Sequence, residues 1–379
     1  MIDFSLSQEQ LALRRLARDF AQKEIAPRAL ELEQQQAHSD EIVEEYYRAG
    51  LLHYGIPVEY GGRGLGSLEG CLLAEELAAV CGGVEVGLYG NILGVLPLLI
   101  AGSPELKDEL LPQHCSGPNL AALCVTEAGA GSDVGSIRTR ASRVGDEYVI
   151  EGTKRFVTNG GVANLYSVIA KEDPQLGLKG LSAFVVPAGT PGLSLGKKED
   201  KLGQRSSDTR EVIFEGVRIP ARFRLGDGLD GFEIAMRTLD SSRPVVGSQA
   251  VGIARAALEV AVAYVKERAQ PGGARQIAQG KQLTLADMAT KLEAARLLCW
   301  QAAWLGDQGR RNTKQSAIAK CFAGDMAVEV TSGAVQLLDV DGVTTEYPVE
   351  RYLRDARAYP IFEGTGEIQR LVIARQLLR

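Results

Sequence analysis

The chain has 379 residues, of which 45% are hydrophobic and 24% are charged, a composition typical of a globular protein with two or three domains. Its 42 Lys and Arg side chains are outnumbered by 48 Asp and Glu side chains, which gives a formal net charge of −6. That acidic balance argues against nucleic-acid binding, because a phosphate backbone attracts a surplus of basic side chains.

The cysteines and the first residues indicate the compartment. Six scattered cysteines form no CxxC pair and three histidines form no ligand cluster, so we expect no metal site and reduced, buried thiols. The start, MIDFSLSQEQ, has neither a secretory nor a transit pattern. The longest apolar run, ILGVLPLLIAG, is shorter than a bilayer span and carries Pro97. We therefore expect a cytoplasmic protein without membrane insertion.

Residues 1–118 are predicted to form an N-terminal helical domain. Ser7 stands three residues before Gln10 in a capping-box pattern, and apolar residues then recur at helical spacing up to Ile25. The stretches SDEIVEEYYRAGLL, SLEGCLLAEELAAV and SPELKDELLPQH continue this period, with Gly/Pro breaks in GIPVEYGGRGLG.

Residues 119–225 are predicted to form a middle antiparallel β domain. The segments LAALCVTE, DEYVIEG, RFVTNG, NLYSVIAKE, LSAFVVPAG and REVIFEGVRIP are short and rich in β-branched and aromatic residues. Turn residues such as Gly145-Asp146 and Gly160-Gly161 separate them at short intervals.

Residues 226–379 are predicted to form a C-terminal helical bundle. One long helical pattern begins at Gly231, two more follow, and the last is TGEIQRLVIARQLL. Long helices joined by short connections usually pack antiparallel in a bundle. The fold class is therefore α+β, in the order helical domain, β domain, helical domain.

A glycine-rich stretch, CVTEAGAGSDVGS, covers Cys124–Ser136. Its third glycine falls at Gly135, off the G-x-G-x-x-G spacing, and a strand-like pattern follows it, so a Rossmann turn is rejected. The bland alternative is a flexible loop of the β domain. The functional alternative is that small residues, with the hydroxyls of Thr126 and Ser132, let a cofactor approach the backbone.

The stretch KRFVTNGG places Phe156 and Thr158 two residues apart, which predicts one strand face for both. Core packing is the default for such a phenylalanine. An aromatic face beside a hydroxyl is also suited to stacking on a flat heteroaromatic ring and hydrogen bonding to it.

Two further stretches carry charge in an apolar setting. In DSSRPV, Arg243 precedes Pro244 near the start of a long helix, with capping and solvation as the default role of the polar residues before it. In YPIFEGTGEIQR, the residues Pro360, Ile361 and Phe362 are expected to press Glu363 into the core, although a solvated surface glutamate is the default. Desolvation would raise the carboxyl pKa toward the range of a general base.

Together these motifs resemble the acyl-CoA dehydrogenases over nearly the whole chain, with the medium-chain branch nearest. The resemblance is carried, in the family's order, by VEYGGRGLG, CVTEAGAGSDVGSIRT, TKRFVTNGG, LGQRSSDTREVIFEGVRIP, SRPVVGSQAVGIARAALEVAVAYVKER and TEYPVERYLRDARAYPIFEGTGEIQRLVIAR. It implies FAD as the cofactor, an acyl-CoA substrate, a homotetramer and reoxidation by an electron-transfer flavoprotein.

The resemblance also implies roles for single residues. Glu363 would be the base that removes the Cα proton of the acyl thioester, while the flavin takes hydride from Cβ to give a trans-2-enoyl-CoA. Some branches keep their base near Arg243, where this chain has Ser242, which favours Glu363. Cofactor contacts would come from Thr126, Ser132, Phe156, Thr158, Arg268, Gln279, Gln336, Val340, Thr365 and Glu367, and substrate contacts from Ser132, Tyr89, Asp240, Arg243 and Gly364.

The chain departs from the family at contacts that normally reach the FAD of a neighbouring subunit. A Gly-Gly pair is replaced by Asp339-Val340, and Pro271 stands in place of an aromatic residue. Weaker FAD binding is the first hypothesis. The alternatives are an FAD-deficient, non-catalytic subunit of a hetero-oligomeric enzyme, and a reductase or oxidase of the same fold.

The acyl pocket is expected to be lined by VEVGLYGN, residues 84–91. Tyr89 stands where the medium-chain branch has a smaller acid, which predicts a shortened or reshaped cavity for short, branched or cyclic acyl groups. Glu85 is expected to be solvated and to play no part in selection. The stretch has no arginine, which disfavours a dicarboxyl-CoA substrate.

Overall fold

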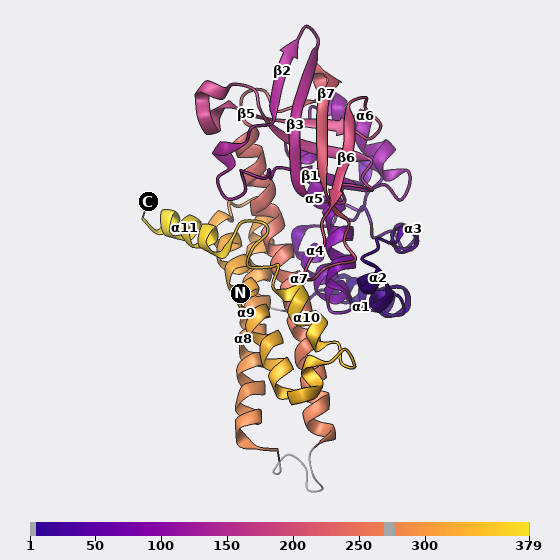
Figure 1. Ribbon diagram of the computed structural model, residues 1–379, viewed down its shortest axis with the longest axis vertical. Coiled ribbons are helices and arrows are strands. Elements are labelled where there is room, and N and C mark those ends of the chain that lie inside the picture. Colours follow the sequence, from indigo (N-terminus) through magenta and orange to yellow (C-terminus); the bar gives the residue numbers. More distant parts are fainter. Residues whose placement is uncertain (1–4, 269–276, 379) are drawn as a thin grey trace.

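The computed structural model describes residues 5–268 and 277–378 and has three parts, shown in Figure 1. The N-terminal helices and the C-terminal bundle lie against one another, and the β domain sits at one end of both. This arrangement confirms the predicted α+β class. Pro271 and its neighbours lie outside the described residues, so the hypothesis about that position has no structural counterpart.

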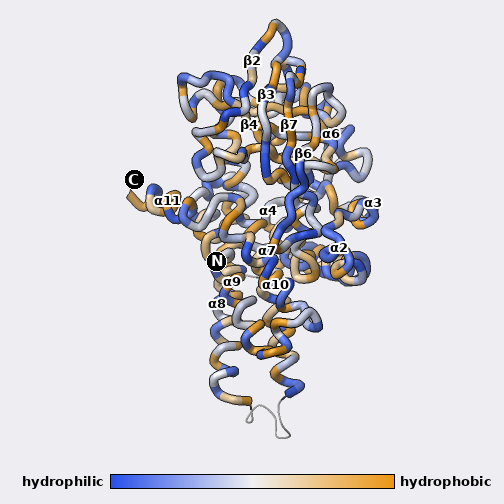
Figure 2. The backbone as a smooth tube through the Cα atoms, viewed as in Figure 1, coloured by the Kyte–Doolittle hydropathy of each residue, from blue (hydrophilic) through white to orange (hydrophobic). Residues whose placement is uncertain are grey.

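The N-terminal part contains six α-helices: α1 (Gln8–Phe20), α2 (Ala29–Gln35), α3 (Asp40–Arg48), α4 (Ser67–Ala78), α5 (Gly82–Ala101) and α6 (Pro104–Cys115). The predicted capping box is present, because the Ser7 hydroxyl accepts from the amide of Gln10 while the Gln10 side chain accepts from the amide of Ser7. Figure 2 shows hydrophilic residues gathered on the outlying α2 and α3. Nearly every residue of α4 and α5 is buried instead, so these two helices form the floor on which the site is built.

The middle part is one sheet of eight strands: β1 (Ala121–Cys124), β2 (Arg140–Val144), β3 (Glu147–Thr158), β4 (Leu165–Lys171), β5 (Leu181–Pro187), β6 (Leu193–Lys198), β7 (Thr209–Pro220) and β8 (Arg224–Leu225). Its order is β6-β7-β3-β2-β4-β5-β8, with β1 beside β4. The prediction of a wholly antiparallel domain is wrong, because β1 and β2 both pair with β4 in parallel. The other pairings are antiparallel.

The C-terminal part is a helical bundle of α7 (Gly231–Glu267), α8 (Gln279–Asp307), α9 (Thr313–Leu337) and α10 (Val349–Ala356), followed by α11 (Gly366–Leu377). A short 3₁₀ segment, Asp339–Val343, joins α9 to the region before α10. The long helix predicted to begin at Gly231 is confirmed. Figure 1 shows α11 projecting from the body of the bundle.

Two described helices, α5 and α7, are long and apolar enough to cross a membrane by length and composition. This corrects the expectation that no apolar stretch reaches that length. Of their most apolar windows, 67% in α5 and 72% in α7 is buried inside the protein. Both helices therefore use their apolar residues as core of the fold, where α5 packs on β1 and α7 packs on α4, α8 and α9.

Candidate active site

The segment that carries Glu363 links α10 to α11 in a strained turn. Glu363 has φ 58° and Gly364 has φ 89°, so both lie in the left-handed region, which a residue with a side chain adopts at a cost of about 1–3 kcal/mol. A Cβ added at Gly364 would come within 2.5 Å of Gln369 Nε2, so only glycine fits there. Thr365 then caps α11, its hydroxyl accepting from the amide of Ile368 at 3.3 Å.

Side chains from other helices hold this turn by its carbonyl groups. Lys320 of α9 is buried and its Nζ donates to the carbonyl of Gly364 at 2.6 Å. Gln369 of α11 donates from Nε2 to the carbonyls of Glu363 and Gly364, both at 3.1 Å. Burial lowers the pKa of Lys320 to about 8, against the attraction of nearby Glu363. These bonds offset the backbone strain of the turn and fix the direction of the carboxylate.

The Glu363 side chain meets α7. Ser242 donates from Oγ to Glu363 Oε2 at 2.7 Å, and the charge of Arg243 also acts on this carboxylate. Burial raises the pKa of Glu363, whereas the Ser242 hydrogen bond, Arg243 and then Lys320 act to lower it. The carboxyl is thus a desolvated acid with one hydroxyl donor and two neighbouring cations. Such an arrangement is suited to accepting a proton.

The apolar wall expected around Glu363 is only partly present. Tyr359 is buried, but Ile361 is 63% exposed, so the prediction that it presses the segment into the core is wrong. Phe362 is half-buried and packs on the Tyr359 ring, with the ring centroids 5.2 Å apart. The desolvation of Glu363 therefore comes from α7 and α9 rather than from the residues next to it in sequence.

Asp240 and Arg243 lie inside α7 and not at its start, which corrects the expectation of a capping role for this stretch. Arg243 is 3% exposed and donates from an NH1 group to Asp240 Oδ1 at 2.8 Å, while its Nε has no partner among the described residues. Pro244 has no amide hydrogen, so it cannot donate to the carbonyl of Asp240 within the helix. Ser316 of α9 donates to that carbonyl instead, at 2.8 Å.

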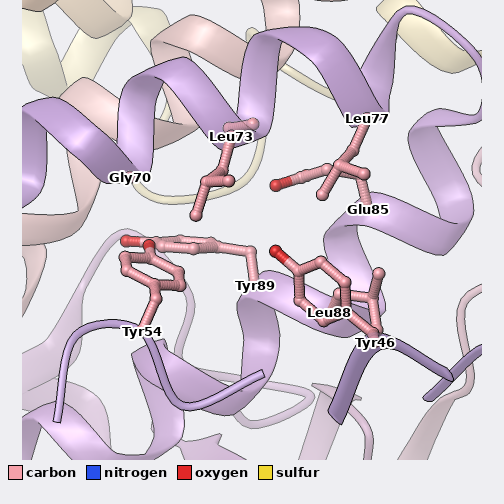
Figure 3. A pocket seen from close by; sticks show the side chains of 9 residues that line it. Tyr46, Tyr54, Gly70, Leu73, Leu77, Glu85, Leu88 and Tyr89 are labelled. Carbon is pink, nitrogen blue, oxygen red and sulfur yellow. The ribbon is translucent and has the colours of Figure 1, made fainter. Parts of the chain in front are cut away.

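Tyr89 of α5 connects this region to the pocket floor. Its hydroxyl donates to the carbonyl of Ser242 at 3.4 Å, and its ring is buried. One helical turn earlier on α5, Glu85 is only 2% exposed, so the expectation that it is solvated is wrong. Figure 3 shows both side chains in one pocket between α4 and α5.

The β domain brings Thr126, Phe156 and Thr158 near α5. The amide of Arg155 donates to the carbonyl of Thr126 at 2.8 Å, and a Cβ added at Gly90 of α5 would lie 2.9 Å from the Thr158 methyl group. Phe156 is 55% exposed with φ 56°, at an irregularity of the β3–β7 pairing between Lys154 and Val157. The default expectation of core packing for Phe156 is therefore wrong, and burial still alternates from exposed Phe156 through buried Val157 to half-buried Thr158.

The glycine-rich loop, residues 125–137, is clamped at its base and open at its tip. Buried Lys154 donates from Nζ to Glu127 Oε1 and to the carbonyl of Val125, both at 2.9 Å, and Glu127 accepts from the amides of Arg138 and Thr139. A Cβ added at Gly129 or Gly131 would meet no atom within 4 Å, and Ser132 is exposed at the same tip. Open backbone beside an exposed Phe156 ring fits one face of a large flat cofactor such as FAD.

The remaining predicted cofactor residues lie elsewhere. Thr365 and Glu367 belong to the first turn of α11, next to Glu363. Arg268 ends α7, 25 residues after Arg243, which places it about 37 Å further along the helix. Gln279 begins α8, Gln336 is near the end of α9, and Val340 follows α9, all exposed. The structure therefore separates two groups of predicted cofactor residues within one chain.

The group at the far end of α7 forms what we call the far-end cluster, comprising Arg268, Asp339, Val340, Asp341 and Val343. Arg268 pairs with Asp341 at 2.7 Å and lies over the Tyr264 ring, 3.7 Å from its centroid. Val340 is 74% exposed, and Asp339 has φ 52°. Asp341 already holds the arginine, so a pyrophosphate at this end would compete with that carboxylate for the same cation.

Comparison with known proteins identifies the family. The N-terminal, middle and C-terminal domain models of acyl-CoA dehydrogenase match residues 7–118, 122–217 and 229–378. The chain belongs to the acyl-CoA dehydrogenase family. Members of this family are FAD-dependent oxidoreductases, and the chain carries all three of their domains.

Individual relatives match over nearly their whole length. The chain is 43% identical over 377 residues to a probable acyl-CoA dehydrogenase FadE25 of Mycobacterium tuberculosis, covering 99% of this chain and 97% of the relative. Butyryl-CoA dehydrogenase from Megasphaera elsdenii is 39% identical with a TM-score of 0.96, and both chains are covered fully. A structure described as the electron transferring flavoprotein of Acidaminococcus fermentans gives 41% identity and a TM-score of 0.96 over both full chains. The structure described as the FAD complex of PigA is 30% identical with a TM-score of 0.93, and 99% of each chain is covered.

Sequence reasoning missed three residues that the structure brings to Glu363. Ser242 was dismissed as unable to act as a base, but it is the hydroxyl donor to the carboxylate. Lys320 and Gln369, which hold the turn, carry no local motif that marks them. A buried lysine at helical spacing among alanines in SAIAKCFAG is the one signal that was available for Lys320.

Proposed function

We propose that this chain is an FAD-dependent dehydrogenase that removes the hydrogens from C2 and C3 of a short acyl-CoA, giving the trans-2-enoyl-CoA. The observation that carries the proposal is the Glu363 carboxylate, which is desolvated, hydrogen-bonded by Ser242 and flanked by the buried cations Arg243 and Lys320. A general base needs both a fixed direction and a raised pKa, and this setting supplies both.

Glu363 acts on the substrate with two of its groups. Its carboxylate takes the C2 proton, and its backbone amide donates to the thioester carbonyl oxygen, where negative charge develops. That amide has no acceptor within residues 5–268 and 277–378, so it is free for the substrate. Arg243 and Lys320 keep the carboxylate ionised against the desolvation that raises its pKa.

The β domain and the start of α11 hold the cofactor in this proposal. Phe156 offers an exposed ring for stacking, and Thr126, Ser132 and Thr158 offer hydroxyls. Thr365 and Glu367 approach from the opposite side, beside Glu363. Bound FAD supplies the two-electron acceptor for the hydrogen that leaves C3.

The substrate lies between α5 and α7. Ser132 contacts its pantetheine arm, Asp240 and Arg243 line the channel toward the base, and Gly364 allows the thioester to approach the backbone. Tyr89 lines the acyl end. The cavity beside Tyr89 has a volume of only ≈ 10 Å³, about the room of one water molecule, which supports a short acyl group.

Assembly as a homotetramer gives the separated residues a role. Arg268, Gln279, Gln336 and Val340 then contact the FAD of a neighbouring copy, since they lie too far from the base of their own chain. The exposed Leu371, Leu377 and Leu378 on the projecting α11 also support contacts between copies.

An electron-transfer flavoprotein would take the electrons from the FAD that these residues would hold. The similarity to a solved structure described by that name supports this acceptor. Six free, buried cysteines support a reducing, cytoplasmic setting.

A panel of acyl-CoA substrates in a dye-reduction assay tests the proposal. The purified protein, reconstituted with FAD, is expected to reduce the dye with short acyl-CoA esters and to release the trans-2-enoyl-CoA, identified by mass spectrometry. A protein that holds FAD yet reduces no dye with any ester, and gives no enoyl product, contradicts it. A best kcat/KM at about twelve carbons or more contradicts the short-chain part alone.

The second candidate is an FAD-deficient, non-catalytic subunit of a hetero-oligomeric acyl-CoA dehydrogenase. The far-end cluster favours it, because Asp341 already holds Arg268 and Asp339 adds a second negative charge. The absorbance spectrum separates the two candidates. A colourless protein that cannot be reconstituted with FAD alone, and that gains flavin only with a second chain, supports the subunit.

A further inference from the structure

The pocket at the end of α5 contains a carboxyl group that the proposed chemistry does not use. Its lining is Tyr46, Tyr54, Gly70, Leu73, Ala74, Leu77, Glu85, Leu88 and Tyr89. Figure 3 shows the Glu85 carboxyl pointing into the space between Leu73 of α4 and the tyrosine rings. We call this space the Glu85 pocket.

Glu85 has no partner for its charge or its hydrogen bonds. Its Oε2 is buried and makes no hydrogen bond within the described part of the chain. The titratable groups that act electrostatically together with it are Tyr46, Tyr54, Tyr89 and Tyr359, and no cation acts on it. Burial therefore raises the pKa of Glu85 well above its usual value, which leaves a neutral acid with a donor and an acceptor.

An unpaired carboxyl in an apolar wall is unfavourable unless a ligand meets it. A buried polar group without a hydrogen bond costs about 1–3 kcal/mol, and a leucine at this position would avoid that cost. The other pocket residues are leucines, small residues and tyrosines, which suit an acyl chain. Glu85 carries the only carboxyl among these lining residues, beside the hydroxyls of Tyr46, Tyr54 and Tyr89, and its unpaired Oε2 distinguishes a polar from an apolar occupant.

Tyr89 links the Glu85 pocket to the catalytic end. Tyr89 lines it and also donates to the carbonyl of Ser242, whose hydroxyl holds Glu363. Glu85 precedes Tyr89 by four residues on α5, about 6 Å along the helix axis. A substrate with its C2 at Glu363 therefore directs the end of a short chain past Tyr89 toward Glu85.

We infer that the enzyme selects a short acyl-CoA whose far end carries a hydroxyl group, and that Glu85 binds this hydroxyl. The inference rests on the proposed acyl-CoA dehydrogenation and names its substrate class. A hydroxyl both donates and accepts, so it pairs with a neutral carboxylic acid at both of its atoms. A second substrate carboxylate is disfavoured, because no cation acts on this end of the pocket.

The test compares esters that differ only by a hydroxyl in place of a methyl group. The two pairs are 4-hydroxybutyryl-CoA with valeryl-CoA and 5-hydroxyvaleryl-CoA with hexanoyl-CoA. The FAD-loaded enzyme is expected to prefer the hydroxyacyl ester at least tenfold in kcat/KM in one pair, because the apolar analogue leaves Glu85 unpaired. Glu85→Leu is expected to reverse this preference, and Glu85→Gln to retain part of it.

A matched control and a binding measurement make the test specific. Leu73→Met changes the same wall without a polar group and is expected to leave the preference within threefold. Calorimetry of the same esters on Glu363→Gln and on Glu363→Gln/Glu85→Leu checks the preference without turnover. Equal use of both esters by the parent enzyme, or a preference that survives Glu85→Leu, overturns the inference. Turnover of none of the four esters overturns the proposed function instead.

Discussion

Two arginines of α7, Arg243 in the interior of the helix and Arg268 at its C-terminal end, have opposite surroundings. Arg243 is 3% exposed, pairs with Asp240 and acts on the Glu363 carboxylate. Arg268, at the C-terminal end, is 48% exposed and pairs with Asp341. Water screens the Arg268–Asp341 pair and not the Arg243–Asp240 pair. Loss of one partner therefore changes the free energy of unfolding strongly at Arg243 and weakly at Arg268.

The comparison also separates two requirements of the proposed enzyme. At the Glu363 end, every polar atom that directs the base is held by a residue from another helix. At the far-end cluster, exposed Val340 and Val343 adjoin carboxylates, and the arginine is already engaged. In the proposed enzyme, the residues that direct the base belong to one chain, whereas the residues proposed to contact a neighbouring FAD lie at the end that departs from the family.

The largest expected effect is the loss of the base. Glu363→Gln keeps the hydrogen bond to Ser242 but cannot take a proton, so flavin bleaching by acyl-CoA is expected to slow by about 10³-fold or more. Rapid-mixing absorbance under anaerobic conditions measures the rate, and spectral perturbation of the flavin measures retained ligand binding. Bleaching within tenfold of the parent rate would mean that another residue removes the proton.

The next effect concerns stability at the Glu363 end. Arg243→Met removes the cation that pairs with Asp240, whose side chain is only 18% exposed, and the free energy of unfolding is expected to fall by about 3–5 kcal/mol. Arg218→Met is the control, since Arg218 and Glu147 form an exposed pair that contributes at most about 1 kcal/mol. Urea unfolding followed by circular dichroism measures both. If both variants lost the same free energy of unfolding, the distinction between the buried and the exposed ion pair would be wrong.

A third change alters the far-end cluster. Asp339→Gly with Val340→Gly removes a charge and two side chains, and Asp339 already has a backbone conformation that glycine adopts without strain. The dissociation constant for FAD is expected to fall about tenfold, or 1.4 kcal/mol. Fluorescence titration of the apoprotein measures it, with Val343→Ala as a control. Unchanged affinity would show that this segment is not part of the cofactor site.

The smallest effect is a shift of the pH profile. Ser242 lowers the pKa of Glu363 by its hydrogen bond, so Ser242→Ala is expected to raise that pKa. Because the base works only when it is ionised, the acid limb of kcat/KM moves to higher pH. A limb that stays in place, or moves to lower pH, contradicts the assignment of Glu363 as the titrating group.

Local patterns predicted the elements and the motif of the base, because helix caps, periodicity and the EGT turn are written in neighbouring residues. The capping box at Ser7 and the helix from Gly231 are examples. The parallel pairing of β1 with β4 could not be read in this way, since no turn joins those strands and the β2–β3 hairpin lies between them.

The residues that surround Glu363 were harder to predict from the sequence. Ser242 lies 121 residues before Glu363 in sequence, and no spacing rule connects an interior turn of α7 with the α10–α11 link. Glu85 was expected in solvent because most glutamates are, and only the packing of α4 over α5 shows it to be buried. The default of core packing for Phe156 is wrong, because its side chain is exposed at a strand irregularity, whereas the stacking role that the resemblance implies stays a prediction.

Pro244 couples two helices that are remote in sequence. Pro244 leaves the Asp240 carbonyl without a donor from its own helix, and the Ser316 hydroxyl of α9 donates to it instead. The position of the turn that carries Ser242 and Arg243 therefore depends on the position of α9. In the proposed mechanism, residues of α9 that do not touch the substrate therefore influence proton abstraction by Glu363. Pro244 removes one hydrogen bond within α7, and the hydrogen bond that replaces it connects α7 to α9. This interhelical bond opposes sliding of α7 along α9.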